Sequence, residues 1–330
     1  MDWMQIFAAA VLAVVGPVTA GYALSAIGLN LQFGYAGLLN FGHVAFMLVG
    51  AYGLAMTVEY GGPLWLGLIV GIAAAVLLGL LLGIPTLRLR ADYFAITSIA
   101  VAEVLRLVVR SSSAQPLTGG VFGLQGFGGA FHALNPFPPD ELFGIAPFVV
   151  TGRNLWVIVV GWLLVLLATL FIARLIRSPW GRVLKAIRED EDATRSLGKN
   201  VFAYKLQALM IGGAIAGMAG MYFALQQQSI HPDAFQPRVT FMLYVMVILG
   251  GAGTIWGPVV GAALFNFLFY GTDELMARLQ ANVEFVGAIL SPADAGLIKY
   301  ILVGIALMLL MVFRPQGLLG SREEGRTDAS

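Results

Sequence analysis

The chain has 330 residues, of which 59% are hydrophobic and only 11% are charged, and its formal net charge is +1. Soluble domains average about 25% charged and about 45–50% apolar residues, so this composition excludes a soluble protein. The nearly balanced charge argues against a nucleic-acid partner, and the lack of cysteine excludes disulfides and thiolate metal sites. A membrane-crossing helix needs about 20 apolar residues, so this length holds roughly eight to ten spans. We therefore expect an all-α integral membrane protein, a polytopic helical bundle forming one transmembrane domain over residues 1–330.

The first part of the chain has no charged residue from Trp3 to Val58. Such a stretch is too long for one crossing, and it predicts two helices joined by a tight turn near residues 28–37. The residues before it lack the basic region of a cleavable signal, and the apolar run is too long for a signal core. We expect the first helix to be a retained span.

Six further apolar runs follow, each bounded by charges or proline: residues 64–84, 94–109, 155–173, 206–228, 239–270 and 297–313. As one straight helix, the run 239–270 would measure about 48 Å, more than a hydrocarbon core of about 30 Å. Its glycines and Pro258 predict an interruption near residues 250–258. Non-helical backbone at that depth must be buried in protein or line a watery cavity.

A second glycine-rich stretch lies at residues 34–53, in the other half of the chain. Paired interrupted segments indicate a transport pathway, and the candidates to line it are Asn40, His43, Gly250, Gly251 and Thr254. The alternative role for the glycines is close packing of helices through small residues. Both alternatives require a tight bundle.

Lysine and arginine collect in a few loops. Residues 174–205 contain eight of them, residues 314–330 three and residues 88–92 two, which makes 13 of the 19 in the chain. Because basic loops stay in the cytoplasm, we expect a cytoplasmic loop at 174–205 and a cytoplasmic tail at 314–330. The run 239–270 then begins and ends on the outer side, so it must cross twice or dip in and return.

Polar side chains inside the predicted spans are few, and they are candidates for function because lipid disfavours them. His43 has no second ligand at metal-binding spacing, so no metal site is expected; it either hydrogen-bonds another helix or lines the path. Glu103 and Arg106 are three residues apart and can pair on one helical face, although Glu103 has an alternative role as an ion-coupling carboxylate. No GxxxxGK[ST] or HExxH motif occurs. We expect no catalytic residues, and hence no enzyme.

The loop at residues 178–198 has the sequence SPWGRVLKAIREDEDATRSLG. Pro179 opens it, apolar residues recur at near-helical spacing, and Gly198 can end a helix. The pattern predicts a short amphipathic helix or pair of helices. Such a helix either lies on the membrane surface or docks to a soluble partner.

This loop resembles the cytoplasmic EAA loop of ABC importer permeases, in which E-A-A is followed by three residues and a glycine. The matching residues are Asp192, Ala193, Thr194 and Gly198, with Asp in place of Glu and Thr in place of the second Ala. The chain as a whole resembles branched-chain amino acid permeases of the LivM/LivH type, and the LivM member more than LivH. The segments that carry this likeness are GYAGLLNFGHVAF at 34–46, LRLRADYFAI at 87–96, LTGG at 117–120, GRVLKAIREDEDATRSLG at 181–198, GGAGTIWGP at 250–258 and RPQGL at 314–318.

The resemblance implies a multi-pass permease of the bacterial inner membrane that imports branched-chain, hydrophobic amino acids. Its implied partners are a homologous LivH-like permease, two cytoplasmic ATP-binding subunits that hold ATP and Mg²⁺, and an extracytoplasmic solute-binding protein; the chain itself would carry no cofactor. The residues that would contact an ATP-binding subunit are Arg188, Asp192, Ala193, Thr194, Arg195 and Gly198. Alternatives are a related importer of urea, amides or sugars, an ion-coupled secondary carrier, and a membrane scaffold that transports nothing.

Overall fold

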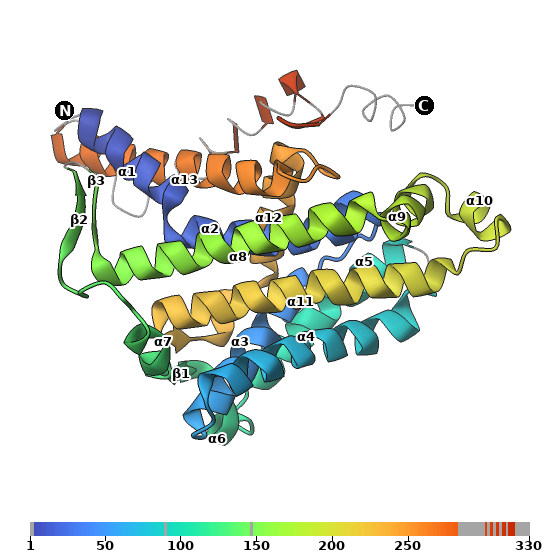
Figure 1. Cartoon of the computed structure of the whole chain (residues 1–330), viewed down its shortest axis with the longest axis horizontal. Helices are drawn as coiled ribbons and strands as arrows, with labels where there is room; N and C mark the ends of the chain where they lie inside the picture. The colour runs from blue at the N-terminus through green and yellow to red at the C-terminus, as the bar shows by residue number, and fades with distance from the viewer. Residues whose placement is uncertain are drawn as a thin grey trace.

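The structure is a computed structural model, and it describes residues 3–88, 91–145, 148–282, 301, 304–305, 308–309, 312–314 and 316–320. Long helices run across the molecule and form most of it (Figure 1). Helices suit these apolar runs because a bilayer offers no partner to the backbone, which must satisfy its hydrogen bonds internally. The main helices of the described residues are α1 (Trp3–Val15), α2 (Pro17–Leu29), α3 (His43–Glu59), α4 (Leu64–Thr86), α5 (Ala91–Arg110), α8 (Gly152–Arg177), α11 (Val201–Gln227), α12 (Pro237–Gly250) and α13 (Gly257–Asn282).

Three of the helices in the described part of the chain are long and apolar enough to cross a bilayer alone, namely α4, α8 and α11 with 23, 26 and 27 residues. At 1.5 Å per residue they measure about 35–40 Å. Helix α11 packs against α2, α3 and α4 in the centre of the bundle. The prediction of an all-α, multi-pass membrane protein is confirmed. The total of eight to ten spans stays a prediction, because most of the run 297–313 lies outside the described residues.

The first charge-free stretch is divided differently from the expectation of two helices. Helices α1 and α2 meet at Gly16 with a bend of 46°, because Pro17 opens α2 and cannot continue the hydrogen bonding of α1. Helix α2 continues into a π-helix, η1 (Asn30–Tyr35), and the chain then turns through residues 36–42 before α3 begins. The turn therefore lies later than the predicted 28–37, and only residues 36 and 37 belong to both. Gly28 lies inside α2, where an added Cβ would come within 2.5 Å of the Gly212 carbonyl oxygen of α11, so it serves packing.

The predicted interruption of the run 239–270 is present. Helix α12 ends at Gly250 and α13 begins at Gly257, and the break between them passes through Gly251 and Gly253, whose φ angles are +111° and +78°. Non-glycine residues rarely adopt such angles. The two helices cross closely, since a Cβ on Gly261 would lie 1.8 Å from the Met246 carbonyl oxygen. Helix α13 extends beyond the predicted end at residue 270, to Asn282.

Short elements cover the two ends of the bundle (Figure 1). One end carries α6 (Gln115–Thr118), η2 (Gly120–Phe122), β1 (Leu124–Gln125), α7 (Gly129–Ala133), β2 (Leu142–Ile145), β3 (Phe148–Thr151), β4 (Ser229–Ile230) and η3 (Pro232–Phe235). Strand β1 pairs antiparallel with β4, and β2 with β3. The opposite end carries α9 (Pro179–Glu189) and α10 (Glu191–Ser196), the two helices predicted within the loop 178–198.

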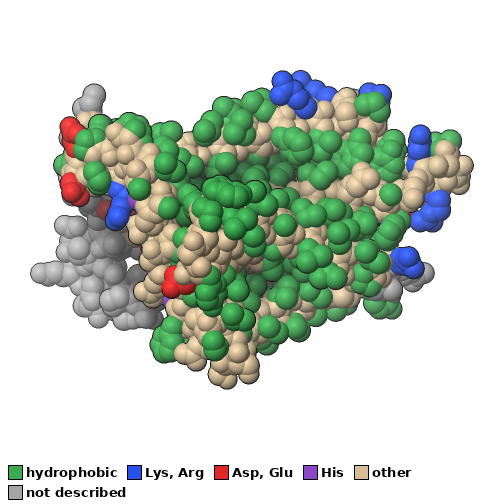
Figure 2. All heavy atoms as spheres, turned by 60° about the horizontal axis from the view of Figure 1, so that its bottom comes forward, with side chains coloured by type: hydrophobic (Ala, Val, Ile, Leu, Met, Phe, Trp, Pro, Cys, Tyr) green, Lys and Arg blue, Asp and Glu red, His purple; other side chains and the backbone are tan. Residues whose placement is uncertain are grey.

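The distribution of charge follows the same division. On the face drawn in Figure 2, Lys and Arg side chains gather toward the end that carries α9 and α10, and hydrophobic side chains cover the middle. Asp and Glu side chains appear toward the opposite end of this face. Of the predicted tail 314–330, residues 315 and 321–330 lie outside the described residues.

Candidate functional site

Three polar side chains, Gln32, Asn40 and His43, form a buried network between the end of α2 and the start of α3. Gln32 and Asn40 join η1 to the following turn, because Asn40 Nδ2 donates to Gln32 Oε1 over 2.9 Å. His43 places Nδ1 at 3.0 Å from the same Gln32 oxygen and Nε2 at 3.1 Å from the Ser25 carbonyl oxygen of α2. Gln32 Nε2 in turn donates to the Leu209 carbonyl of α11 over 3.0 Å.

This network is enclosed by protein. Gln32, Asn40 and His43 have no exposed surface, and each of their polar atoms described above meets a partner, as buried polar groups require. Of the two alternatives left open for His43, the hydrogen bond to another helix is the one present in this conformation. The assignment of Asn40 and His43 to a translocation path stays a prediction.

The two interrupted segments, far apart in the sequence, meet through Asn30. Its Nδ2 donates to the Thr254 carbonyl over 2.8 Å, and its Oδ1 accepts from Gly253 N over 2.8 Å. Gly34 permits this approach, since a Cβ there would lie 2.5 Å from Gly253 N. The sequence predicted that both segments are interrupted, and the structure shows that they contact each other through Asn30.

Thr254 and Gly250, both predicted path residues, organise the break itself. Thr254 Oγ1 donates to the Gly251 carbonyl over 2.7 Å and accepts from Gly257 N over 3.1 Å, so it caps the start of α13. The carbonyl of Gly250 accepts a hydrogen bond of 3.0 Å from Leu319 N, near the end of the described chain. The motif at 314–318 therefore leads into a segment that covers the break, a role that its sequence did not indicate.

The loop between α8 and α11 folds into two capped helices. Ser178 caps α9 and Asp190 caps α10, where Ala193 N donates to Asp190 Oδ1 over 2.9 Å. Leu184 and Ile187 bury the apolar face of α9 against the bundle. Gly198 ends the second helix with a φ of +77°. The amphipathic pair predicted from the sequence is confirmed.

The tip of this loop presents some of the predicted contact residues and hides one. Asp192, Ala193, Arg195 and Gly198 are exposed, and Arg195 pairs with Asp192 and with Glu191 of its own helix, at 2.9 Å each. Thr194 is only 4% exposed, and its hydroxyl donates to the Asp190 carbonyl; its contact with an ATP-binding subunit stays a prediction. Leu197, which the sequence did not single out, is 79% exposed at the same tip.

Arg188 turns away from this tip and into its own chain. Its guanidinium donates to the Gly34 carbonyl of η1, and its Cγ would lie 3.5 Å from a Cβ on Gly37. A Cβ on Gly253 would lie 2.8 Å from Arg188 Nη1. This contact ties α9 to both interrupted segments; Arg188 remains exposed, and its contact with an ATP-binding subunit stays a prediction. Spacing within the loop gave no signal for a contact with a carbonyl 154 residues away.

A family model described as "Branched-chain amino acid transport system / permease component" matches residues 6–312, nearly the whole chain. The chain belongs to this permease family.

Individual members of the family agree with the likeness to LivM. The high-affinity branched-chain amino acid transport system permease protein LivM of Escherichia coli is 32% identical over 325 residues, 92% of this chain and 69% of that protein. LivH of the same organism is 25% identical over 323 residues, 93% of this chain and 94% of that protein. The fructose import permease protein FrcC of Rhizobium meliloti is 25% identical over 296 residues, 86% of this chain and 74% of that protein. The identity is higher to LivM than to LivH, as the sequence blocks predicted.

The permease carries a cluster of charges at the end opposite α9 and α10. Arg106 Nε donates to Glu103 over 3.0 Å, which confirms the predicted pair. Arg106 also bonds Asp233 of η3, to which Arg110 comes within 3.5 Å. Asp233 lies 127 residues from Arg106, so helical spacing could not indicate it. The cluster fastens the end of α5 to the segment that leads into α12.

Proposed function

We propose that this permease is the LivM-type membrane subunit of an ATP-driven importer of branched-chain, hydrophobic amino acids. It would sit in the bacterial inner membrane with its C-terminus in the cytoplasm, and ATP would be bound and hydrolysed by separate subunits. The names of its LivM and LivH relatives support the amino-acid class of the substrate. The observation that carries the coupling mechanism is the position of Arg188 between the exposed α9–α10 loop and the two interrupted segments.

The geometry of the loop suits the transmission of movement from a bound partner to the bundle. Both helices are capped, α9 is held to the bundle by buried Leu184 and Ile187, and the exposed tip carries Ala193, Leu197 and Gly198. Small side chains permit close approach of a partner, and an exposed leucine offers apolar surface that a partner can bury. Movement of the tip would reach η1 and the break 251–256 through Arg188. ATP binding would then favour one arrangement of these segments over the other.

The remaining partners follow from the two ends of the bundle. Two ATP-binding subunits would bind at the α9–α10 end, one on this chain and one on a homologous LivH-like permease. A solute-binding protein would bind at the end formed by α6, α7, η2 and η3. The Leu319 contact with Gly250 supports a cytoplasmic C-terminus, because it places the tail at the break that Arg188 also touches.

Association with the ATP-binding subunits tests the docking role. Ala193→Arg and Gly198→Trp are expected to reduce the amount of ATP-binding subunit that co-purifies by about tenfold or more, which corresponds to about 1.4 kcal/mol. Ala133→Arg is the matched control, because Ala133 is also exposed but lies at the opposite end. Undiminished co-purification in both loop variants would contradict the proposal.

Uptake in vesicles tests the transport role. The complete complex is expected to accumulate L-leucine, L-isoleucine and L-valine only when ATP is supplied on the α9–α10 side. Fructose should be tested as a competing solute in the same vesicles, because FrcC is among the relatives. Uptake of fructose in preference to leucine would replace the proposed substrate class.

A further inference from the structure

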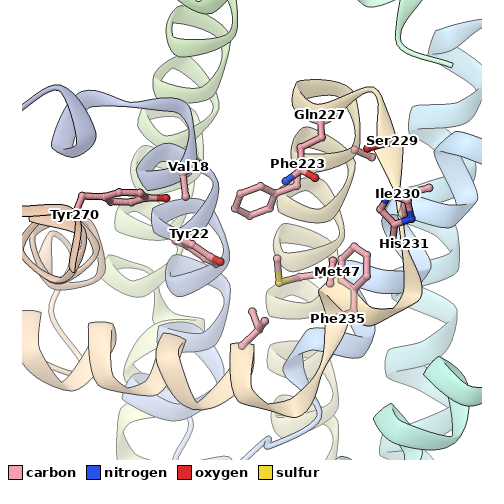
Figure 3. A pocket seen from close by; sticks show the side chains of 13 residues that line it. Val18, Tyr22, Met47, Phe223, Gln227, Ser229, Ile230, His231, Phe235 and Tyr270 are labelled. Atoms are coloured by element: carbon pink, nitrogen blue, oxygen red, sulfur yellow. The ribbon is translucent and has the colours of Figure 1, made fainter. Parts of the chain in front are cut away.

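A cavity of about 230 Å³ lies at the end of the bundle that carries β4 and η3. It is bounded by α2, α3, α11, α12, α13 and the connection from β4 to η3. Figure 3 shows Tyr270 of α13, Tyr22 of α2 and Phe223 of α11 extending toward one another across it. The cavity is separate from the buried network of Gln32, Asn40 and His43, since none of these residues lines it.

The lining changes from apolar to polar between its inner wall and its mouth. Met47, Ile230 and Phe235 are 2%, 3% and 6% exposed and form the buried apolar wall. The aromatic rings of Tyr22 and Phe223 are half-buried at the sides. The polar side chains of Gln227, Ser229 and His231 line the cavity where it is more exposed, with Gln227 the most open of them.

This gradient matches an amphipathic solute of small size. Pockets for drug-sized ligands occupy about 300–1,000 Å³, so this cavity suits a smaller molecule such as one free amino acid. The lining contains no Asp, Glu, Lys or Arg, so nothing there would compensate a net charge. A hydrophobic zwitterion satisfies both conditions, because its branched side chain fits the apolar wall and its ammonium and carboxylate can meet the amide, hydroxyl and imidazole at the mouth.

Gly21 shapes one side of the cavity without lining it. A Cβ on Gly21 would lie 2.5 Å from Cζ of Phe223. The Phe223 ring can therefore occupy its observed position only because Gly21 has no side chain. The Phe223 ring then packs against Tyr22, with centroids 5.1 Å apart. Any side chain at Gly21 would push Phe223 out of this place, toward the space that a solute would occupy.

We propose that this cavity between α2, α11, α13 and η3 is a binding site for one hydrophobic zwitterionic amino acid within this subunit, on the side where the solute enters. The inference rests on the proposed function and deepens it. The chain would thus hold the solute by itself at one step of transport, with Tyr22, Phe223 and Met47 against the side chain and Gln227, Ser229 and His231 at the charged ends.

Photolabelling of the unaltered transporter tests the site directly. The complex with its binding protein and ATP-binding subunits is irradiated in proteoliposomes with photo-leucine, a diazirine analogue of leucine. Adducts are expected on the peptides of this chain that contain Phe223 and Phe235, and excess L-leucine should suppress them. Adducts confined to other parts of the complex, or adducts on these peptides that leucine does not suppress, would overturn the proposal.

A filled cavity provides the second test. Ala224 lines the cavity and is 2% exposed, so Ala224→Met would occupy it. At saturating solute, the maximal leucine uptake should fall about tenfold, in line with the strain of overfilling a packed site, while alanine uptake should fall less than about twofold. Gly21→Ala should lower the leucine-to-alanine ratio in the same direction. The control is Ala168→Met, because Ala168 is 5% exposed and lines a different, apolar cavity between α8 and α11.

Failure of this inference is distinguishable from failure of the proposed function. Normal ATP-dependent leucine uptake with labels elsewhere, or with an unchanged leucine-to-alanine ratio in both cavity variants, would overturn only the site. Absence of ATP-dependent leucine uptake by the unaltered complex would overturn both.

Discussion

Arg188 of α9 donates a hydrogen bond to the backbone carbonyl of Gly34 in η1. The two residues belong to different parts of the permease, the cytoplasmic loop in our proposal and the first interrupted segment. Gly253 of the second interrupted segment lies against the same guanidinium. One side chain therefore reaches both irregular segments of the bundle, and a charged donor gives this contact more strength than a neutral one.

Replacement of Arg188 should separate ATP hydrolysis from transport. Arg188→Ala removes the donor to Gly34 and is expected to lower ATP-dependent uptake about tenfold or more, in keeping with a charge-assisted hydrogen bond of about 1.5–3 kcal/mol. Co-purification of the ATP-binding subunits should persist, because the Arg188 guanidinium is engaged by the Gly34 carbonyl. Arg182→Ala is the control, since Arg182 is an exposed arginine of the same helix and is not the donor to Gly34. Equal uptake in the Arg188 and Arg182 variants would show that the contact is not used.

Asn30 should matter for stability more than its size suggests. Asn30→Ala removes both hydrogen bonds between η1 and the break 251–256 and leaves Gly253 N and the Thr254 carbonyl without this partner. A loss of about 1–3 kcal/mol in the free energy of unfolding is expected. Thermal unfolding in detergent measures it, with the exposed Asn154→Ala as control. An unchanged transition in Asn30→Ala would contradict the closure of the two segments on each other.

Gly28 should not tolerate a side chain. Gly28→Val would place Cβ 2.5 Å from the Gly212 carbonyl oxygen, whereas a Cβ on Gly129 meets nothing within 4 Å. Overpacking of this kind is expected to destabilise the fold by about 1–3 kcal/mol or more. The yield of monodisperse protein should therefore fall for Gly28→Val and not for Gly129→Val. Equal yields would mean that α2 and α11 are less close than described.

The role of the Glu103 carboxylate distinguishes the two hypotheses of an ATP-driven importer and an ion-coupled carrier, because only the carrier would need it for transport. Its pairing with Arg106, which also bonds Asp233, has the geometry of a structural cluster. Partly exposed ion pairs contribute about 0.2–1 kcal/mol, so Glu103→Gln should retain uptake within about a factor of five. A protonophore should leave uptake in ATP-loaded vesicles intact. Loss of uptake in both experiments, with normal ATP hydrolysis, would favour the carrier.

Sequence patterns predicted those features that local rules govern. Charge-free length predicted spanning helices, Gly250 and Pro258 predicted the break, and Pro179 with Gly198 predicted the capped pair α9 and α10. The turn expected at residues 28–37 was misplaced because glycine has two uses: Gly28 lets α11 approach, whereas Gly37, with a φ of +67°, does lie where the chain turns. Composition alone does not distinguish these two uses.

Contacts between residues far apart in the sequence could not be predicted from local sequence patterns. The Asn30–Gly253 bond joins residues 223 apart, and the cavity beside Phe223 gathers side chains from five helices and a loop. Tyr22 and Phe223 gave no signal in the sequence because aromatic residues are common in apolar runs. Motif position likewise does not reveal which side of a short helix faces the protein; Thr194 lies on that side and is 4% exposed.

The position of the α9–α10 tip is the most direct test of the account, and the lack of native cysteine makes it practical. Leu197→Cys places one thiol at a side chain that is 79% exposed. A membrane-impermeant maleimide should label it in inverted vesicles and not in intact cells, and a short bis-maleimide should cross-link it to a cysteine engineered on the ATP-binding subunit. Labelling from outside intact cells, with no cross-link in the active complex, would contradict the central claim.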